Sequence, residues 1–141
     1  WGEGEIYLAT SDDLVEWTPI VDENNNPVAV VQPRNGFFDS VLAELGPPAV
    51  ITEDGIVFIY NGKSDKGGYS AGQLLFDLNN PLKLLARSDM PFVEPQTDYE
   101  TLGQYTAGTV FTQGLVRFQE KWFLYYGAAD SAVGVMYTYE D

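Results

Sequence analysis

The sequence predicts an all-β fold of the β-propeller type, with about two to three blades of four antiparallel strands each. Short runs of β-branched and aromatic residues, separated by turn residues, follow one another almost throughout the chain. The run GIVFIYNGKSD…YSAGQLLFD also recurs as KWFLYYGAADS…AVGVMYTYE. A strand unit that repeats at this spacing is typical of propeller blades. Hydrophobic residues make up 45% of the chain and aromatic residues 14%, which is enough for a core and argues against disorder.

The N-terminal part predicts short strands around a polar loop. EIYLAT (5–10) has the composition of a strand, and a second strand is expected near WTPI (17–20). DENNNP (22–27) is rich in Asn and ends in Pro, which is typical of a loop. VAVVQ (28–32) follows as another strand. This part is similar to the outer strands of a blade that precedes the repeat.

The middle of the chain carries the strongest hairpin signal. Asp54-Gly55 separates AVIT (49–52) from IVFIY (56–60), and Asp-Gly between two apolar runs favours a tight hairpin. IVFIY is apolar at successive positions, so we expect protein to cover both of its faces. A Gly-rich loop then leads to a strand in YSAGQLLFD (69–77). LKLLARS (82–88) is compatible with a helical turn or a strand, and we favour a strand.

The C-terminal part predicts three adjacent strands and one more after a loop. TVFTQ, GLVRF and WFLYYG lie within residues 109–127, and a polar turn separates the last two. AADS forms the next loop, and AVGVMYTYE (132–140) is the strand after it. The stretch MPFVEPQTDYE (90–100) is interrupted by prolines and is expected to be irregular.

This number of strands does not close a propeller ring. An unclosed propeller exposes strand edges and apolar blade faces. We therefore expect residues 1–141 to form a single propeller-type domain that is either part of a longer propeller or a subunit of a homo-oligomer.

Composition excludes several functions. The net charge is −14, from 21 acidic and 7 basic residues, so nucleic acids and anionic membrane surfaces are disfavoured partners. A neutral carbohydrate would be indifferent to this charge. The chain has no Cys and no His, which removes disulfides, thiol nucleophiles, His-based triads and ordinary zinc sites. We expect no metal and no cofactor, and acid–base chemistry must come from Asp, Glu, Tyr or Lys. Nothing in the composition indicates a compartment.

The segment FFDSVLAELGPP (37–48) raises a functional question, because Asp39 and Glu44 stand in otherwise apolar sequence. One interpretation is a turn in which Asp39 bonds its own backbone. The other is the rim of an active site. Arg34 is equally compatible with a substrate contact and a surface salt bridge. Aromatic residues that could stack on a sugar ring include Tyr105, although most of them are expected in the core.

The segments FDS…GPP…TEDGIVFIYNG and YYGAAD together resemble glycoside hydrolase family 130, the mannoside phosphorylases and related mannosidases. The resemblance covers nearly all of the chain and implies a five-bladed β-propeller that acts on β-mannosides. It implies that Asp130 holds the sugar at the cleavage site, with Asp39 and Ser40 beside the same pocket. In the phosphorylases a Lys and a His help to hold phosphate, at the positions of Leu42 and Asn61 here. Because neither residue carries a charge, the resemblance favours hydrolysis over phosphorolysis.

Glu44 stands where the phosphorylases tend to have a small residue. A carboxylate there would repel phosphate and could activate water, as the base of an inverting hydrolase does. Glu44 is therefore the candidate catalytic residue, and Asp39, Ser40, Asn61, Tyr105 and Asp130 are candidate substrate-binding residues. The alternative for Glu44 is a solvated loop carboxylate.

The acidic motif that carries the family's general acid is not found in these residues. A carboxylate base without its acid cannot run ordinary glycoside hydrolysis. This leaves two functions open: part of a family 130 glycosidase, or a non-catalytic carbohydrate-binding or scaffolding module.

Overall fold

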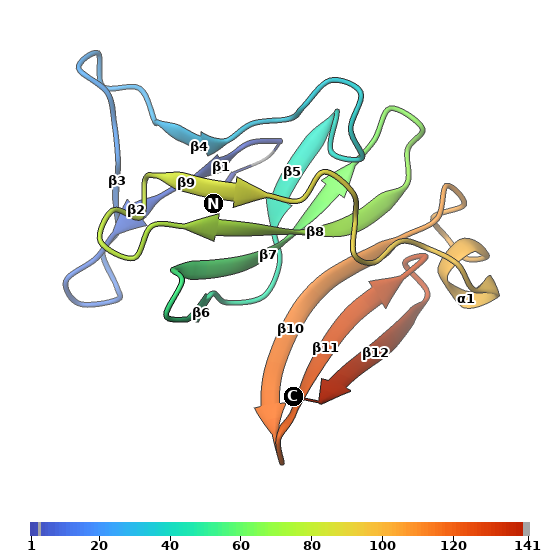
Figure 1. Ribbon diagram of the computed structural model, residues 1–141. Helices are drawn as coiled ribbons and strands as arrows, with labels where there is room; N and C mark the ends of the chain where they lie inside the picture. Colours follow the sequence, from blue (N-terminus) through green and yellow to red (C-terminus); the bar gives the residue numbers. More distant parts are fainter. Residues whose placement is uncertain (3, 140–141) are drawn as a thin grey trace.

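The computed structural model describes residues 1–2 and 4–139, and strands dominate the chain (Figure 1). The central sheet is an antiparallel meander of β5 (Leu42–Leu45), β7 (Ile56–Lys63), β8 (Tyr69–Phe76) and β9 (Leu84–Arg87). The short strand β6 (Val50–Ile51) pairs with the first residues of β7. The strand predicted within residues 82–88 is confirmed as β9. The strand β5 was not predicted, and it lies inside the segment that was interpreted as a turn or a rim.

The Asp54-Gly55 hairpin is confirmed. Val50 and Ile51 of β6 pair with Val57 and Ile56 of β7, and the amide of Thr52 donates to the carbonyl of Gly55 at 2.8 Å. Gly55 has φ +147°, and a Cβ there would lie 2.3 Å from the carbonyl oxygen of Phe76. Only glycine fits this position, because any side chain would collide with the backbone of β8.

The C-terminal sheet consists of β10 (Val110–Phe118), β11 (Lys121–Ala128) and β12 (Ala132–Tyr139), all antiparallel. The prediction of separate strands for TVFTQ and GLVRF was wrong, because both belong to β10. The pairing register shifts between Thr112 and Gly114, which marks a bulge. A bulge bends a strand without ending it, so a sequence that reads as two strands forms one.

The N-terminal residues form two small ladders. β1 (Ile6–Tyr7) pairs with β4 (Ala29–Val31), and β2 (Ala9–Thr10) pairs with β3 (Thr18–Pro19). The single strand expected over residues 5–10 is therefore split between two partners.

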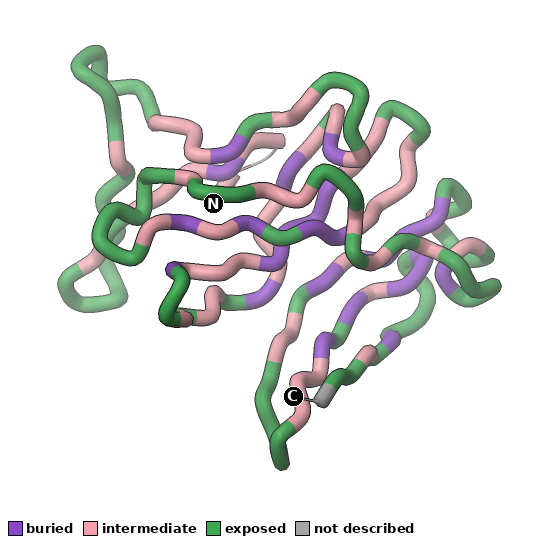
Figure 2. The backbone as a smooth tube through the Cα atoms, in the orientation of Figure 1, coloured by how far each residue is buried: buried purple, intermediate pink, exposed green. Residues whose placement is uncertain are grey.

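Both faces of the central sheet pack against other parts of the chain, and most residues of β7 and β8 are buried or half-buried (Figure 2). Tyr60 and Leu74 point to one face, where they pack with Ile6 and Val31 of the N-terminal strands. Ile59 and Ala71 point to the other face and pack with Leu124 of the C-terminal sheet. Since side chains alternate along a strand, β7 contributes to both cores, as predicted from its apolar run.

The helix α1 (Asp98–Thr101) lies in the stretch expected to be irregular, near the end of β11 (Figure 1). Thr97 and Glu100 form a capping box around its first turn. The pattern Thr-x-x-Glu is a sequence signal for a helix start, and it could have been recognised in QTDYE. This described helix is neither long enough nor apolar enough to span a membrane.

Within the described residues the sheets remain open, and the path β5-β7-β8-β9, to which β6 adds a fifth short strand, has the strand number predicted for one blade. The face of the C-terminal sheet that points away from the central sheet exposes apolar side chains, with Val133 79% and Tyr137 62% exposed. The all-β class is thus confirmed, whereas the number of blades and the oligomeric state stay predictions.

Candidate active site

Strand register places Glu44 in a polar group on one face of the central sheet. Glu44 of β5 is paired with Asn61 of β7, and directly paired residues in an antiparallel ladder point to the same side. Lys63 follows two residues later on the same face, and it is paired with Tyr69 of β8. This is the face that carries Ile59 and meets the C-terminal sheet. The group lies where β7 ends and β8 begins.

Two tyrosine rings hold the ammonium group of Lys63. Its Nζ lies 5.3 Å from the ring centroid of Tyr69 and 5.6 Å from that of Tyr105. The Tyr105 hydroxyl donates to the carbonyl of Gly67 at 2.8 Å, which fixes that ring. A hydrogen bond with Tyr105 is the largest cause of the raised pKa of Lys63, and the charge of Glu44 also contributes. Lys63 therefore stays protonated next to Glu44.

Asp130 belongs to the same group. Burial is the main cause of the raised pKa of Tyr69, and the carboxylates of Glu44 and Asp130 both raise it further, while Lys63 opposes them. The two carboxylates thus act on one tyrosine although they come from different sheets. The structure brings together three of the predicted site residues, Glu44, Tyr105 and Asp130.

A strained turn presents Asp130. Ala129 and Asp130 both have left-handed backbones, with φ +46° and +52°, in the hairpin between β11 and β12. The Nε2 of Gln104 donates to the carbonyl of Asp130 at 3.1 Å, and the amide of Tyr105 donates to the carbonyl of Ala129 at 3.1 Å. Non-glycine residues rarely adopt this conformation, and here tertiary contacts maintain it.

Asn61 joins the two sheets. Its Oδ1 accepts hydrogen bonds from the amide of Thr112 at 2.7 Å and from the Thr112 hydroxyl at 2.9 Å, and its Nδ2 donates to the Thr112 carbonyl at 3.0 Å. Asn61 is fully buried. The side chain that was predicted to contact substrate therefore serves as a bridge between β7 and β10 in this structure.

Asp39 is also fully buried, in a cage of cationic and phenolic donors. Its Oδ2 accepts from the guanidinium of Arg87 at 2.5 Å, from Arg34 at 3.0 Å and from the hydroxyl of Tyr60 at 2.5 Å. Burial, with the hydrogen bond to Asp39 adding to it, raises the pKa of Tyr60 to about 12. Arg34 also bonds the exposed Asp89 at 3.1 Å. Both interpretations of Asp39 from sequence missed this ion-pair cage.

Asp39 lies on the opposite face of the sheet from Glu44. Tyr60 and Gly62 alternate with Asn61 along β7 and therefore point to the N-terminal side. A Cβ at Gly62 would come within 2.7 Å of the Cβ of Asp39, which shows how closely Asp39 packs there. Ser40, predicted beside the same pocket, accepts a hydrogen bond from the amide of Asp65 at 3.2 Å. The structure thus separates Asp39 from the group around Glu44.

Three charged residues of this region were not selected from the sequence. Lys63 could have been found by counting two residues from Asn61 along the strand. The Thr-x-x-Glu pattern could have indicated Glu100. Arg87 carried no local signal, because its partner Asp39 is 48 residues away.

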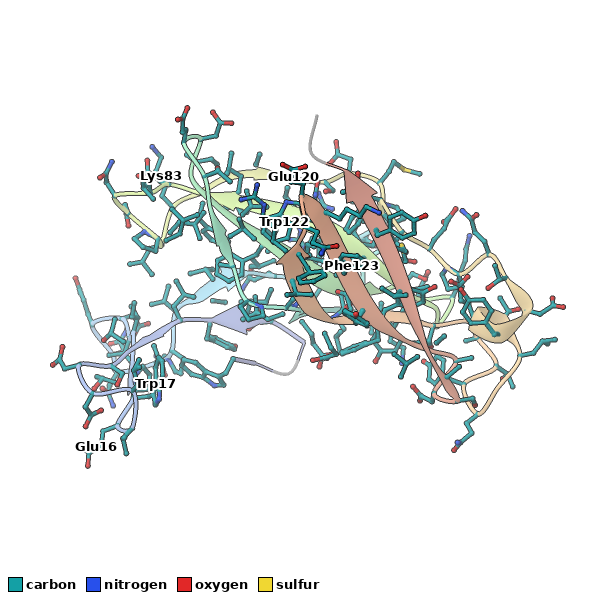
Figure 3. All side chains as sticks on the ribbon, turned by 90° about the horizontal axis from the view of Figure 1, so that it is seen from below. Glu16, Trp17, Lys83, Glu120, Trp122 and Phe123 are labelled. Carbon is teal, nitrogen blue, oxygen red and sulfur yellow. The ribbon has the colours of Figure 1, made fainter. Side chains whose placement is uncertain are left out.

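An apolar cleft lies elsewhere. A cleft of about 780 Å³ separates the central and C-terminal sheets, and its walls are mainly apolar, with Val57, Ile59 and Leu124 among them. Trp122 also lines it, on β11 (Figure 3). These residues come from the first halves of β7 and β11, whereas Lys63 and Asp130 follow at the other ends of those strands. We regard the polar group as the candidate site, because the cleft offers few groups for acid–base chemistry.

Among the residues that the structure describes, no group of three or more Asp, Glu, His or Cys side chains is placed to hold a metal ion.

A protein-family model described as β-1,4-mannooligosaccharide phosphorylase matches residues 2–141. A curated relative, 1,2-β-oligomannan phosphorylase from Thermoanaerobacter sp. (strain X514), is 33% identical over 131 residues. The match covers 93% of this chain and 42% of the relative.

Solved structures are more similar. A glycosyl hydrolase from Bacteroides ovatus is 48% identical with a TM-score of 0.92, over 97% of this chain and 41% of that one. A second structure is 47% identical with a TM-score of 0.95, over 99% of this chain and 41% of that one. It was reported with the finding that this family of mannoside phosphorylases contains glycoside hydrolases that target β-1,2 mannosidic linkages in Candida mannan. The family's solved neighbours are β-propellers. The chain spans about two fifths of the length of the proteins it matches.

Proposed function

The chain belongs to glycoside hydrolase family 130, and we propose that it forms part of the active site of an enzyme that hydrolyses β-mannosides. The observation that carries this proposal is a group in which Glu44 shares a face with Lys63, the ammonium of Lys63 lies near the rings of Tyr69 and Tyr105, and the amide of Tyr105 bonds the turn that presents Asp130. This group lies at one end of both the central sheet and the C-terminal sheet, where a carbohydrate could reach the carboxylates of Glu44 and Asp130.

Each residue has a role that follows from its chemistry. In an inverting hydrolase a carboxylate base takes a proton from water, and the water attacks the anomeric carbon on the side opposite the leaving group. Glu44 is half-buried and would be that base. Asp130 is exposed on its turn and would accept hydrogen bonds from sugar hydroxyls. Tyr105 would offer an aromatic face to the apolar side of the ring. The general acid that protonates the leaving group would come from residues outside this chain.

Hydrolysis is favoured over phosphorolysis by charge. A phosphate dianion needs cationic ligands, and Leu42, on the same face as Glu44, is apolar. The neighbouring ammonium group of Lys63 is already balanced in part by the charge of Glu44. Asn61 is neutral, and Thr112 already occupies its side chain. Glu44 itself would repel an anion. The greater identity to the Bacteroides ovatus hydrolase than to the Thermoanaerobacter phosphorylase supports the same choice.

The test is an assay of mannoside cleavage by the 141-residue chain, carried out with and without phosphate. Because the chain covers 41% of the Bacteroides ovatus hydrolase, residues 2–141 would also be grafted in place of the matching part of that protein. We expect the graft to release mannose from β-1,2- or β-1,4-mannobiose at a rate that phosphate does not change. A phosphate-dependent mannosyl phosphate product would overturn the hydrolytic assignment.

Glu44→Gln is the decisive variant in the graft. Removal of a general base typically lowers kcat by about 10²–10⁴-fold, with a smaller effect on KM. Asp54→Asn, in the β6–β7 hairpin, is the matched control and should keep full activity. Sugar binding without turnover in the unmodified graft would point to the non-catalytic carbohydrate-binding alternative.

A further inference from the structure

We propose that Lys63 is a positioning residue for Glu44, with an ammonium group that keeps the Glu44 carboxylate ionised and turned toward the site. The importance of this pair for catalysis rests on the proposed function. The charge relationship itself does not, and it can be measured separately.

Strand pairing brings the two side chains within reach. Lys63 is paired with Leu42, and Glu44 is paired with Asn61, so Lys63 and Glu44 are diagonal neighbours on one face of the β5–β7 ladder. Diagonal neighbours in an antiparallel sheet lie roughly 7–8 Å apart at the backbone, a gap that long side chains can bridge. Glu44 is half-buried there, so its charge is screened less than that of a fully exposed carboxylate.

The side chains around Lys63 restrict the positions that its ammonium group can adopt. The Nζ atom lies 5.3 Å from the ring centroid of Tyr69 and 5.6 Å from that of Tyr105. The two rings contact each other edge-on at 5.6 Å, and Tyr69 also contacts Phe111 of β10 at 5.4 Å. An ordinary surface lysine samples many rotamers, whereas this one is held before any substrate arrives. The Lys63 side chain therefore loses little further conformational entropy when a substrate binds.

The other ionisable groups of this cluster do not replace Lys63. Asp130, from the β11–β12 turn, is a second carboxylate and opposes ionisation of Glu44. Tyr69, from β8, has a raised pKa, mainly through burial, and stays neutral. Lys63, from β7, is the cation of the group. The hydrogen bond with Tyr105 is the main cause of the raised pKa of Lys63, and the charge of Glu44 adds to it. Because the interaction between two charges is mutual, the same attraction favours the carboxylate form of Glu44.

The sign of the effect follows from this attraction. A general base must be unprotonated to accept a proton from water. With Lys63 present, Glu44 keeps its negative charge down to a lower pH. Without Lys63, Glu44 would take up a proton at a higher pH, and the acid limb of the rate profile would move upward.

The test is an NMR titration of the Glu44 side-chain carboxyl carbon in the 141-residue chain. The signal would be assigned by its loss in Glu44→Gln. Lys63→Met should shift the Glu44 titration midpoint upward, and Lys63→Arg should restore most of the original value because it keeps the charge. Lys66→Met is the matched control, since it removes one positive charge from the exposed loop that follows β7 and should leave the midpoint unchanged.

The result that overturns the proposal is an unchanged Glu44 midpoint in folded Lys63→Met. Lys63→Gln, which keeps a polar side chain of similar reach, gives the same test if the Met variant does not fold. A loss of stability in either variant without a shift in the midpoint would assign Lys63 a structural role and would also contradict the proposal.

An activity profile separates this inference from the proposed function. In the active graft, Lys63→Met should move the acid limb of kcat to higher pH while activity at alkaline pH is retained. If Glu44→Gln keeps full activity, the proposed function fails, and the midpoint shift still decides the charge relationship. A uniform loss of activity at every pH, with no midpoint shift, would mean that Lys63 does not act through Glu44.

Discussion

Asp39 and Glu44 stand five positions apart in one apolar segment, yet they lie in opposite environments. Asp39 is fully buried on the N-terminal side of the central sheet, where two arginines and a tyrosine saturate its carboxylate. Glu44 is half-buried on the other side, beside a single lysine and near a second carboxylate across the sheets.

The comparison shows what distinguishes a structural carboxylate from a chemical one. Every contact of Asp39 is an internal donor, so a substrate could reach it only by breaking the cage. Glu44 lies on the face that meets the C-terminal sheet, as the diagonal neighbour of Lys63. Residue type and sequence position are nearly the same in the two cases, and the face of the sheet decides between them.

The largest expected effect is on the stability of the cage. Asp39→Asn leaves the guanidinium groups of Arg34 and Arg87 without their buried anion, and breaking a buried ion pair in this way costs about 3–5 kcal/mol. Urea denaturation would measure the loss. Asp89→Asn is the control, because Asp89 also pairs with Arg34 but its side chain is 78% exposed, and it should change stability by less than about 1 kcal/mol. Equal losses of stability in Asp39→Asn and Asp89→Asn would contradict the distinction between a buried and an exposed ion pair.

A third carboxylate, Glu100, sharpens the comparison. It is 5% exposed, and although burial opposes its ionisation, the amide of Gln96 and the hydroxyl of Tyr126 lower the pKa of Glu100 to about 2. Because the folded state favours the ionised form of Glu100, this carboxylate adds roughly 3 kcal/mol to the free energy of unfolding above pH 4.5. The contribution is lost as the pH falls toward 2.

Glu100→Gln should therefore destabilise the protein at pH 7 and much less at pH 2–3. Denaturation at both pH values, compared with Asp98→Asn in the exposed first turn of α1, would check this. If the difference in free energy of unfolding between Glu100→Gln and the wild type is as large at pH 2–3 as at pH 7, the Glu100 charge has no role in stability. The backbone of Glu100 also bonds Thr109, which bonds Ala129, so the variant should loosen the turn that presents Asp130.

The smallest effect on stability is expected at Glu44. Glu44→Gln keeps the size of the side chain and removes a charge that is not enclosed, so stability should change by no more than about 0.5–1 kcal/mol. Activity, in contrast, should be lost in the graft. A stability loss as large as that of Asp39→Asn would mean that Glu44 is another structural carboxylate, and the comparison would fail.

Local signals in the sequence were sufficient for much of the fold. The Asp54-Gly55 turn, the apolar run of β7 and the repeat that became β8 and β12 follow from backbone preferences and side-chain alternation between neighbouring residues. The family resemblance identified the chain, and the comparisons confirm it. Among the site residues, Asp130 was selected from the resemblance, Glu44 from its contrast with the phosphorylases, and Tyr105 as an aromatic that could stack on a sugar. Their roles remain proposals.

Tertiary structure decided what distant residues do. Asp39 meets Arg87 across 48 positions, and Asn61 meets Thr112 across 51. No periodicity or turn signal extends over such separations, because these contacts arise from the packing of sheets rather than from preferences within a segment. The sequence by itself determined which residue types this segment could offer for acid–base chemistry. Only the packing of three layers determined that Asp39 would be enclosed by Arg34, Arg87 and Tyr60, and that Glu44 would lie on the other face beside Lys63.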